Sequence, residues 1–182
     1  MNETLTPQQL DKEGQTAFRA GRYSEAAAAF ERAVAGFTAA GDALGAAEAA
    51  NNRSVALLKA GDAAGALQAA TGTEAVFAAA ADPKRQGMAC ANQAAALEAL
   101  NRPEEALEWY GRSSDLLKQA GEKEFRAIVL ESITNLQLRT GKQLQALASM
   151  DAALENKPRL SFKDRLLKKL LKTPLDMLRR KE

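Results

Sequence analysis

Three asparagines stand at related places in the sequence, and their side chains suit the binding of a peptide backbone. Asn92 follows Asn52 by 40 residues. A further 40 residues lead to position 132, and Asn135 lies about one helical turn beyond it. An amide carries two donors and an acceptor, so a row of asparagines could hold an extended peptide. Asparagine is a mediocre helix former, and inside a helix it usually needs a partner. The row predicts peptide binding; the alternative is that the amides are solvated or bridge neighbouring repeats.

A basic row accompanies the asparagines. Arg19, Lys59 and Arg139 occupy related places, and they could attract the carboxylates of an acidic peptide or a free C-terminus. Acidic residues fall on the same predicted face, so its field is mixed and a preference for acidic ligands is only a secondary hypothesis. These acidic residues are Asp11, Glu48, Glu98 and Glu131.

The composition argues against an enzyme. The chain has no histidine and one cysteine, Cys90, whereas transition-metal sites and nucleophile–base pairs draw on several such residues. No glycine-rich phosphate loop or convincing carboxylate pair is present either. We therefore expect no catalytic residue, no metal site and no cofactor. Cys90 cannot form an internal disulfide and stands among alanines, so we expect it to be buried and reduced.

The composition also bears on location. Hydrophobic residues make up 46% of the 182 and charged residues 26%, and most of the apolar content is alanine. The first residues do not form a basic segment followed by an apolar run, and no stretch of about 18 apolar residues occurs. We therefore expect a soluble, cytoplasmic protein whose helices pack in thin layers.

Turn signals organise the chain with a period of 40 residues. In the first series, an alanine follows each turn five positions later, and a second series has the same period. Glycine and asparagine tolerate the left-handed backbone that ends a helix. The series begin at Gly21, Gly61, Asn101 and Gly141, and at Gly41, Ala81 and Gly121.

The intervals between the turns have helical periodicity. Phe30, Ala33 and Phe37 are one example, and Leu97 with Leu100 is another. The sequence therefore predicts eight helices in four hairpins: 7–20 with 24–39, 44–59 with 63–79, 84–100 with 103–119, and 123–140 with 143–156.

The hairpins resemble the tetratricopeptide repeat (TPR) family. The resemblance covers residues 7–158, in repeats of about 7–40, 44–80, 84–120 and 123–158, and the long period is similar to that of kinesin-light-chain-type repeats. The second repeat departs most, with Ser54, Ala70 and Thr73 at motif positions. The signature residues are Gly14, Gly21, Tyr23, Ala26, Phe30 and Ala33, then Asn101, Pro103, Ala106 and Tyr110, then Gly141, Ala146, Met150, Ala153 and Pro158.

This resemblance implies a right-handed superhelical solenoid of four TPR-like helical hairpins plus a C-terminal capping helix. It also implies a scaffold or adaptor that binds a peptide or partner helix in a concave groove lined by the first helix of each hairpin. Helical geometry of about 100° per residue then selects the residues that face the groove. The predicted partner-binding residues are Lys12, Gln15, Arg19, Asn52, Lys59, Asn92, Asn135 and Arg139.

The charge changes sign after Pro158. Residues 159–182 contain nine basic and three acidic residues, a net +6, and since the whole chain carries +2 the remainder carries −4. Ser161 and Asp164 form a helix-start signature, and a second short helix is expected to begin at Thr173. Between these starts, an apolar stripe opposes a basic one: Phe162, Leu166, Leu167, Leu170 and Leu171 against Lys163, Lys168, Lys169 and Lys172.

This basic tail has two interpretations. Solenoids need an amphipathic helix to cover the last repeat, and the tail's position and lack of Trp or Tyr favour that role. The alternative is a peripheral membrane-associated or self-assembling protein that docks through its basic amphipathic helix. The chain could also form a homo-oligomer. Nucleic-acid binding is not expected, because the tail lacks the interleaved aromatic residues that are typical of it. The tail contacts expected under either interpretation are Phe162, Leu166, Leu170, Lys168, Lys169 and Lys172.

Overall fold

The computed structural model describes residues 5–179, with side chains described as far as residue 172. Every regular element in that range is an α-helix, which confirms the predicted all-α class. The helices are α1 (Pro7–Arg19), α2 (Tyr23–Ala39), α3 (Ala43–Lys59), α4 (Ala63–Ala70), α5 (Thr73–Ala79), α6 (Pro83–Ala99), α7 (Pro103–Gln119), α8 (Lys123–Arg139), α9 (Gln143–Asn156) and α10 (Phe162–Arg179). None of these helices is long and apolar enough to cross a bilayer.

Each predicted turn closes on a residue with a left-handed backbone. Five of these residues are glycines, and Asn101 (φ 56°) and Ala81 (φ 53°) adopt the same region despite their Cβ atoms. At each of these turns, the N–H of the next residue donates to the carbonyl five positions earlier, as Arg22 does to Ala17. This is the Schellman arrangement, which satisfies carbonyls at a helix C-terminus. The turns therefore set the helix lengths.

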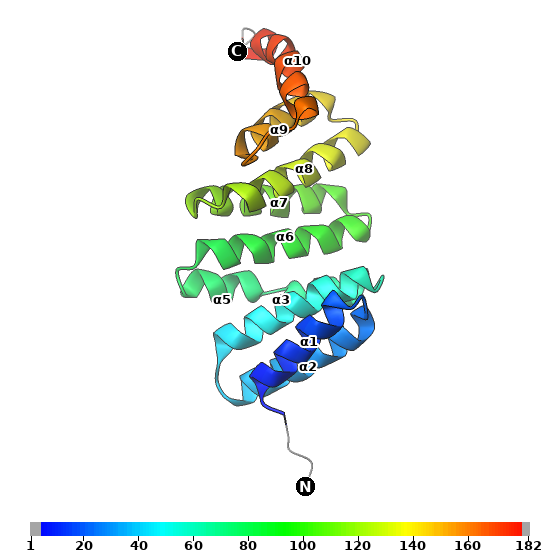
Figure 1. The fold of residues 1–182 in the computed structure, drawn as a ribbon, viewed down its shortest axis with the longest axis vertical. Helices are drawn as coiled ribbons and strands as arrows, with labels where there is room; N and C mark the ends of the chain where they lie inside the picture. The colour runs from blue at the N-terminus through cyan, green and yellow to red at the C-terminus, as the bar shows by residue number, and fades with distance from the viewer. Residues whose placement is uncertain (1–4, 180–182) are drawn as a thin grey trace.

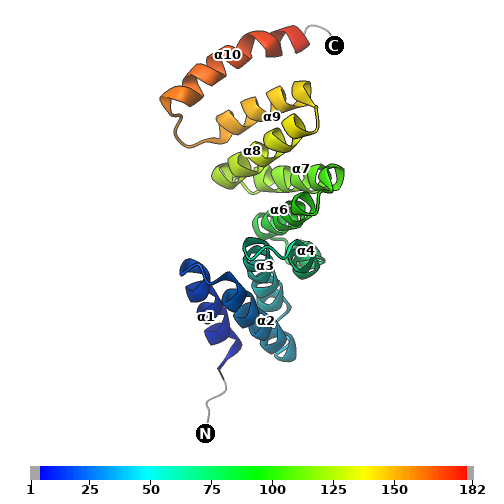
Figure 2. The same cartoon turned by 90° about the vertical axis from the view of Figure 1, so that its right-hand side faces the viewer.

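Most helices that follow one another in the chain pack against one another, and α4 and α5 both pack against α6. Figure 1 shows them stacked in chain order along the longest axis, with the two ends of the chain at opposite ends of the stack. In Figure 2, α1, α3, α6 and α8 lie along one side, α2, α4 and α7 lie along the other, and α9 lies between α8 and α10. The row of α1, α3, α6 and α8 is bent, so that α1 and α8 stand further out than α3 and α6 (Figure 2).

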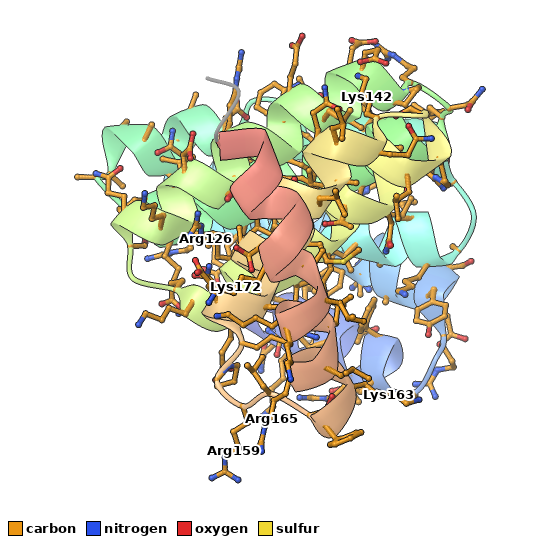
Figure 3. The ribbon with its side chains drawn as sticks, turned by 90° about the horizontal axis from the view of Figure 1, so that it is seen from above. Arg126, Lys142, Arg159, Lys163, Arg165 and Lys172 are labelled. Atoms are coloured by element: carbon orange, nitrogen blue, oxygen red, sulfur yellow. The ribbon has the colours of Figure 1, made fainter. Side chains whose placement is uncertain are left out.

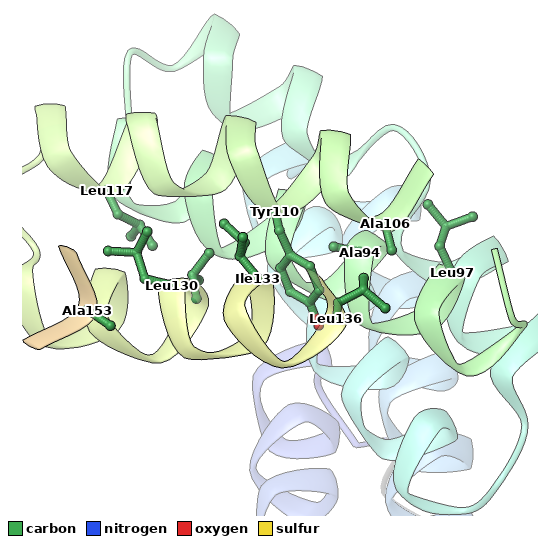
Figure 4. Packing of buried hydrophobic residues seen from close by; sticks show 10 residues of the cluster. Ala94, Leu97, Ala106, Tyr110, Leu117, Leu130, Ile133, Leu136 and Ala153 are labelled. Carbon is green, nitrogen blue, oxygen red and sulfur yellow. The ribbon is translucent and has the colours of Figure 1, made fainter. Parts of the chain in front are cut away.

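The core is divided between a large C-terminal cluster and smaller N-terminal ones. The large cluster joins α6 to α9. Ile133 and Leu136 lie beside Tyr110, and Leu117 and Leu130 lie together further along the same helices (Figure 4). The N-terminal clusters consist mostly of alanines around single aromatic rings. The alanines after the first series of turns are fully buried, which lets paired helices approach closely. They are Ala26, Ala66, Ala106 and Ala146.

As far as residue 156, the helix bounds agree with the predicted ones to within one residue, with one exception. The prediction of a continuous helix over 63–79 is wrong, because α4 ends at Ala70 and α5 begins at Thr73. Thr71 takes an extended backbone and Gly72 a left-handed one, with φ 83°. Glycine enters this region without the steric cost that other residues bear, so the chain can bend here.

The C-terminal segment also differs from prediction. Residues 162–179 form the single helix α10, so no second helix begins at Thr173. The predicted start is confirmed: the Asp164 N–H donates to Ser161 Oγ (3.2 Å), and the Ser161 N–H donates to Asp164 Oδ2 (2.9 Å). Residues 180–182 of the predicted tail lie outside the described range.

The expected apolar stripe of α10 is split between two faces. Leu171 is buried and Leu167 half-buried on the side that packs against α9. Phe162, Leu166 and Leu170 are exposed. The apolar residues therefore do not form a single stripe that covers the last repeat, because α10 meets α9 at an angle that buries only one edge of the stripe.

Candidate functional site

The predicted partner-binding residues belong to α1, α3, α6 and α8, which share one side of the stack (Figure 2). Asn52 and Asn92 are half-buried, and the other six are exposed. The structure does not bring all eight together. It divides them among separate cavities and contacts along this side. We call the side formed by α1, α3, α6 and α8 the first-helix wall.

One cavity gathers three of the predicted residues. It lies between α1 and α3 with a volume of about 340 Å³, and Gln15, Arg19 and Asn52 contribute to its polar rim, together with Glu48. Its remaining lining is apolar: Phe18, Phe30 and Val55. An apolar cavity with a few convergent polar groups is the usual form of a binding site. We call it the α1/α3 pocket.

The amides at this pocket are joined through one carboxylate. Gln15 Nε2 donates to Asp11 Oδ2 (2.7 Å), and Asn52 Nδ2 donates to Asp11 Oδ1 (3.4 Å). The second contact is long for a hydrogen bond, so it contributes little energy. Asn52 therefore bridges neighbouring helices, as the alternative interpretation held, but its amide is held loosely enough to bind a ligand.

The acidic and the basic residue at the pocket rim differ in whether they have an ion-pair partner. Glu48 faces Arg85, whose Nη1 lies 3.4 Å from the Glu48 carboxylate. Arg19 has no ion-pair partner among the side chains described, and neither has Lys59 one hairpin further along. Because Glu48 is partly neutralised while Arg19 is not, the pocket rim favours an anionic group.

Asn92 lies at a different place, beside the break between α4 and α5. Its Nδ2 is 3.5 Å from Oδ1 of Asn51, which is buried and also lies 3.1 Å from the Thr73 hydroxyl. That hydroxyl is 2.7 Å from the Ala70 carbonyl as well. The pattern is that of a bridge between α3, α5 and α6, so the structure places Asn92 in a helix-packing network rather than in the α1/α3 pocket.

A glutamine completes this network. Gln93 is buried, and its Nε2 donates to the Ala70 carbonyl (3.2 Å) and to Glu74 Oε2 (2.7 Å). The break in the helix frees the Ala70 carbonyl from its normal partner, and an unpaired buried carbonyl is costly. Sequence reasoning missed Asn51 and Gln93. The available signal was the glycine at 72, with polar residues 21 positions before it and 21 positions after it, about half a repeat on either side.

The remaining predicted residues are separate from the α1/α3 pocket. Asn135 lines a second cavity of about 300 Å³, bounded also by α9 and α10. Lys12 lines a third, of about 380 Å³, with residues of α2. Arg139 is bound to Glu98 (2.7 Å), which also accepts a hydrogen bond from the Tyr110 hydroxyl (3.0 Å).

Burial and the Glu98 carboxylate together raise the pKa of Tyr110, so this phenol stays protonated and donates. The Glu98 carboxylate thereby joins α6, α7 and α8. The basic row predicted from the sequence is therefore reduced at its far end, because Arg139 is already engaged in a contact between helices. Two of its members, Arg19 and Lys59, stay available.

Apolar residues on the wall were also missed. Met88, Ile128 and Leu138 are exposed on α6 and α8. Met88 and Ile128 stand one and two repeats after Glu48, and Leu138 stands one repeat after Glu98. Their half of the wall is therefore less polar than the half that holds the α1/α3 pocket. The spacing of 40 between Met88 and Ile128 was a signal that attention to polar residues overlooked.

Comparison with known proteins adds no assignment. No model of a known protein family matches this chain, and no curated protein matches it either.

Proposed function

We propose that this chain is a non-enzymatic scaffold of the tetratricopeptide type, which binds a peptide segment of another protein on its first-helix wall. The proposed form is a right-handed superhelical solenoid. It is supported by the regular left-handed turns, by the packing of successive helices and by the side on which alternate helices lie (Figure 2). The observation that carries the function is the α1/α3 pocket, because it lies on this wall and contains three of the predicted residues.

The pocket suits an apolar side chain followed by an acidic group. Phe18, Phe30 and Val55 offer a dry surface for the apolar side chain, whose burial is worth about 25 cal/mol per Å². Arg19 would pair with a carboxylate of the peptide, and the loosely held Asn52 amide would bind its backbone. The same wall continues to Lys59, which extends the attraction for acidic residues by one hairpin.

A non-enzymatic role is supported by the state of the single thiol. Cys90 is buried, as predicted, and this burial raises the pKa of its thiol to about 11. A thiol with such a pKa is almost entirely protonated at neutral pH, and the thiol form is a poor nucleophile. With no histidine in the chain to act as its base, Cys90 serves as a small apolar residue of α6.

The proposal can be tested with peptides selected on the immobilised full-length chain from a random displayed library. Affinity of the enriched peptides would be measured by fluorescence anisotropy for wild type, Val55→Gln and Arg19→Ala. Matched controls are Val76→Gln, a half-buried valine of α5, and Arg32→Ala, an exposed arginine of α2. We expect each pocket variant to weaken binding about tenfold, equivalent to about 1.4 kcal/mol, and the controls to bind as wild type.

Circular dichroism would show that each variant is folded. If folded Val55→Gln and Arg19→Ala bind every enriched peptide as well as wild type, the pocket is not the binding site. If no peptide is enriched above background, the proposed peptide-binding function itself is wrong.

A further inference from the structure

The outer face of α10 exposes three large apolar side chains in a row. Phe162 is 82% exposed, Leu166 50% and Leu170 63%. They are four residues apart, which places them along one face of the helix. Soluble proteins seldom leave such a row uncovered, and an apolar face rimmed by polar residues marks an interaction site.

These three side chains are not needed to dock α10. The inner face packs on α9 through Leu171, which is 4% exposed, and through half-buried Leu167. The Asp164 carboxylate lies 3.1 Å from Lys157 Nζ and ties the start of α10 to the preceding loop. A helix whose only role was to cover the last repeat would present a polar outer face, so the exposed row requires another explanation.

Basic residues flank the row on both sides. At about 100° per residue, Lys163 falls beyond Leu170 on one side of the row. On the other side fall Arg165, Lys169 and Lys172, all exposed. In Figure 3, Lys163 and the pair Arg165 and Lys172 lie on opposite sides of α10. The acidic residue among the described side chains of α10, Asp164, is occupied by Lys157 and Ser161.

We propose that this outer face binds the surface of an anionic lipid membrane, with Phe162, Leu166 and Leu170 entering the boundary between headgroups and acyl chains. Basic side chains beside an apolar row are the arrangement that anionic bilayers attract. Lys163, Lys169 and their neighbours would then lie at the level of the lipid headgroups. The proposal is independent of the peptide site on α1 and α3.

Two other occupants fit less well. A second copy of the chain would bring two basic faces together, which like charges oppose. A partner helix would seek a groove between two helices, whereas among the described residues no second helix lies beside the outer face of α10 (Figures 1 and 2). The cavity beside it opens on its inner side, towards Glu131 and Met150. A flat lipid surface can meet a single convex helix.

The test is co-flotation of the full-length chain with vesicles of phosphatidylcholine alone or with about a quarter phosphatidylserine. We expect binding to the anionic vesicles only, decreasing as salt is added. Lys169→Gln/Lys172→Gln should lower the partition coefficient about 25-fold, because each basic residue near an anionic surface contributes about fivefold. Phe162→Ser/Leu170→Ser should abolish binding.

Matched controls lie elsewhere on the surface. Leu144→Ser removes an exposed leucine of α9, and Lys118→Gln/Lys123→Gln removes two exposed charges; neither should change flotation. The proposal is overturned if wild type does not float with anionic vesicles, or if these controls lose as much binding as the α10 variants. It is also overturned if light scattering shows a dimer that Leu170→Ser dissociates. Peptide affinity measured on the α10 variants separates this result from a failure of the peptide-binding proposal.

Discussion

Two glycines inside helices should respond in opposite ways to the same substitution. Gly14 lies in α1 against the ring of Phe30, and a Cβ added there would lie 2.7 Å from Cδ1 and Cε1 of that ring. Gly111 lies in α7, where an added Cβ would meet nothing within 4 Å. Gly14→Ala and Gly111→Ala therefore compare one added methyl group with and without space for it.

The magnitudes follow from two opposing contributions. Alanine in place of helical glycine stabilises by about 0.5–1 kcal/mol, and Gly111→Ala should gain this amount in full. At Gly14, overpacking costs about 1–3 kcal/mol, because the Phe30 ring is buried among alanines of α1, α2 and α3 and cannot move away freely. Gly14→Ala should therefore lose about 1 kcal/mol, which separates the two variants by about 2 kcal/mol.

The assay is urea unfolding followed by far-UV circular dichroism, with free energies extrapolated linearly and the slopes compared. Phe30 also lines the α1/α3 pocket, so Gly14→Ala should weaken binding of the selected peptides, whereas Gly111→Ala should not. If Gly14→Ala is as stable as wild type, or if Gly111→Ala is the less stable of the two, the Phe30 ring does not limit the space at Gly14.

Three further predictions concern single groups. Ser113→Ala should raise the free energy of unfolding by about 1 kcal/mol, because the buried Ser113 hydroxyl has no hydrogen-bond partner among the described residues; a lower urea midpoint would show that it has one. A thiol reagent at neutral pH should label Cys90 much more slowly in the folded chain than in urea, since burial raises the pKa of this thiol to about 11; equal rates would exclude burial. The hydroxyl and N–H of Ser161, with the Lys157 ammonium, lower the pKa of Asp164 from 3.8 to about 2, so its contribution to docking α10 is complete above pH 3.8 and is lost as the pH falls towards 2. As the pH falls from 3.8 towards 2, an acid-active protease should therefore release the tail of wild type increasingly fast. Release from Asp164→Asn should not change over this pH range, and the same pH dependence in both proteins would argue against the pairing of Asp164.

The turns explain why the helices could be predicted from the sequence. Gly21 and its counterparts take a left-handed backbone for reasons that reside in the residue itself and its immediate neighbours. The break at Gly72 was missed because a glycine inside a periodic segment can also be accommodated in a helix. The freed Ala70 carbonyl accepts hydrogen bonds from the Thr73 hydroxyl and from Gln93 of α6. The second contact comes from a distant part of the chain, which local patterns do not reveal.

The sequence was enough to predict which helix face carries the candidate site, but not which residues contact one another there. A spacing of 40 placed Asn52 and Asn92 on the same wall, yet the observed bridges join residues 41 apart, such as Asp11 with Asn52 and Glu98 with Arg139. That offset arises from the way successive hairpins are rotated and shifted against one another. For the same reason, periodicity placed Leu167 and Leu170 in one stripe, whereas the angle between α9 and α10 buries only one edge of it.

Hydrogen–deuterium exchange with a selected peptide would show whether α1 and α3 together bind it. Amide exchange would be compared along the full-length chain with and without the peptide. If the peptide lies in the α1/α3 pocket, exchange slows in residues 7–19 and 43–59 and is unchanged in α10. Protection confined to α7 and α9, or to α10, would show that the peptide binds elsewhere.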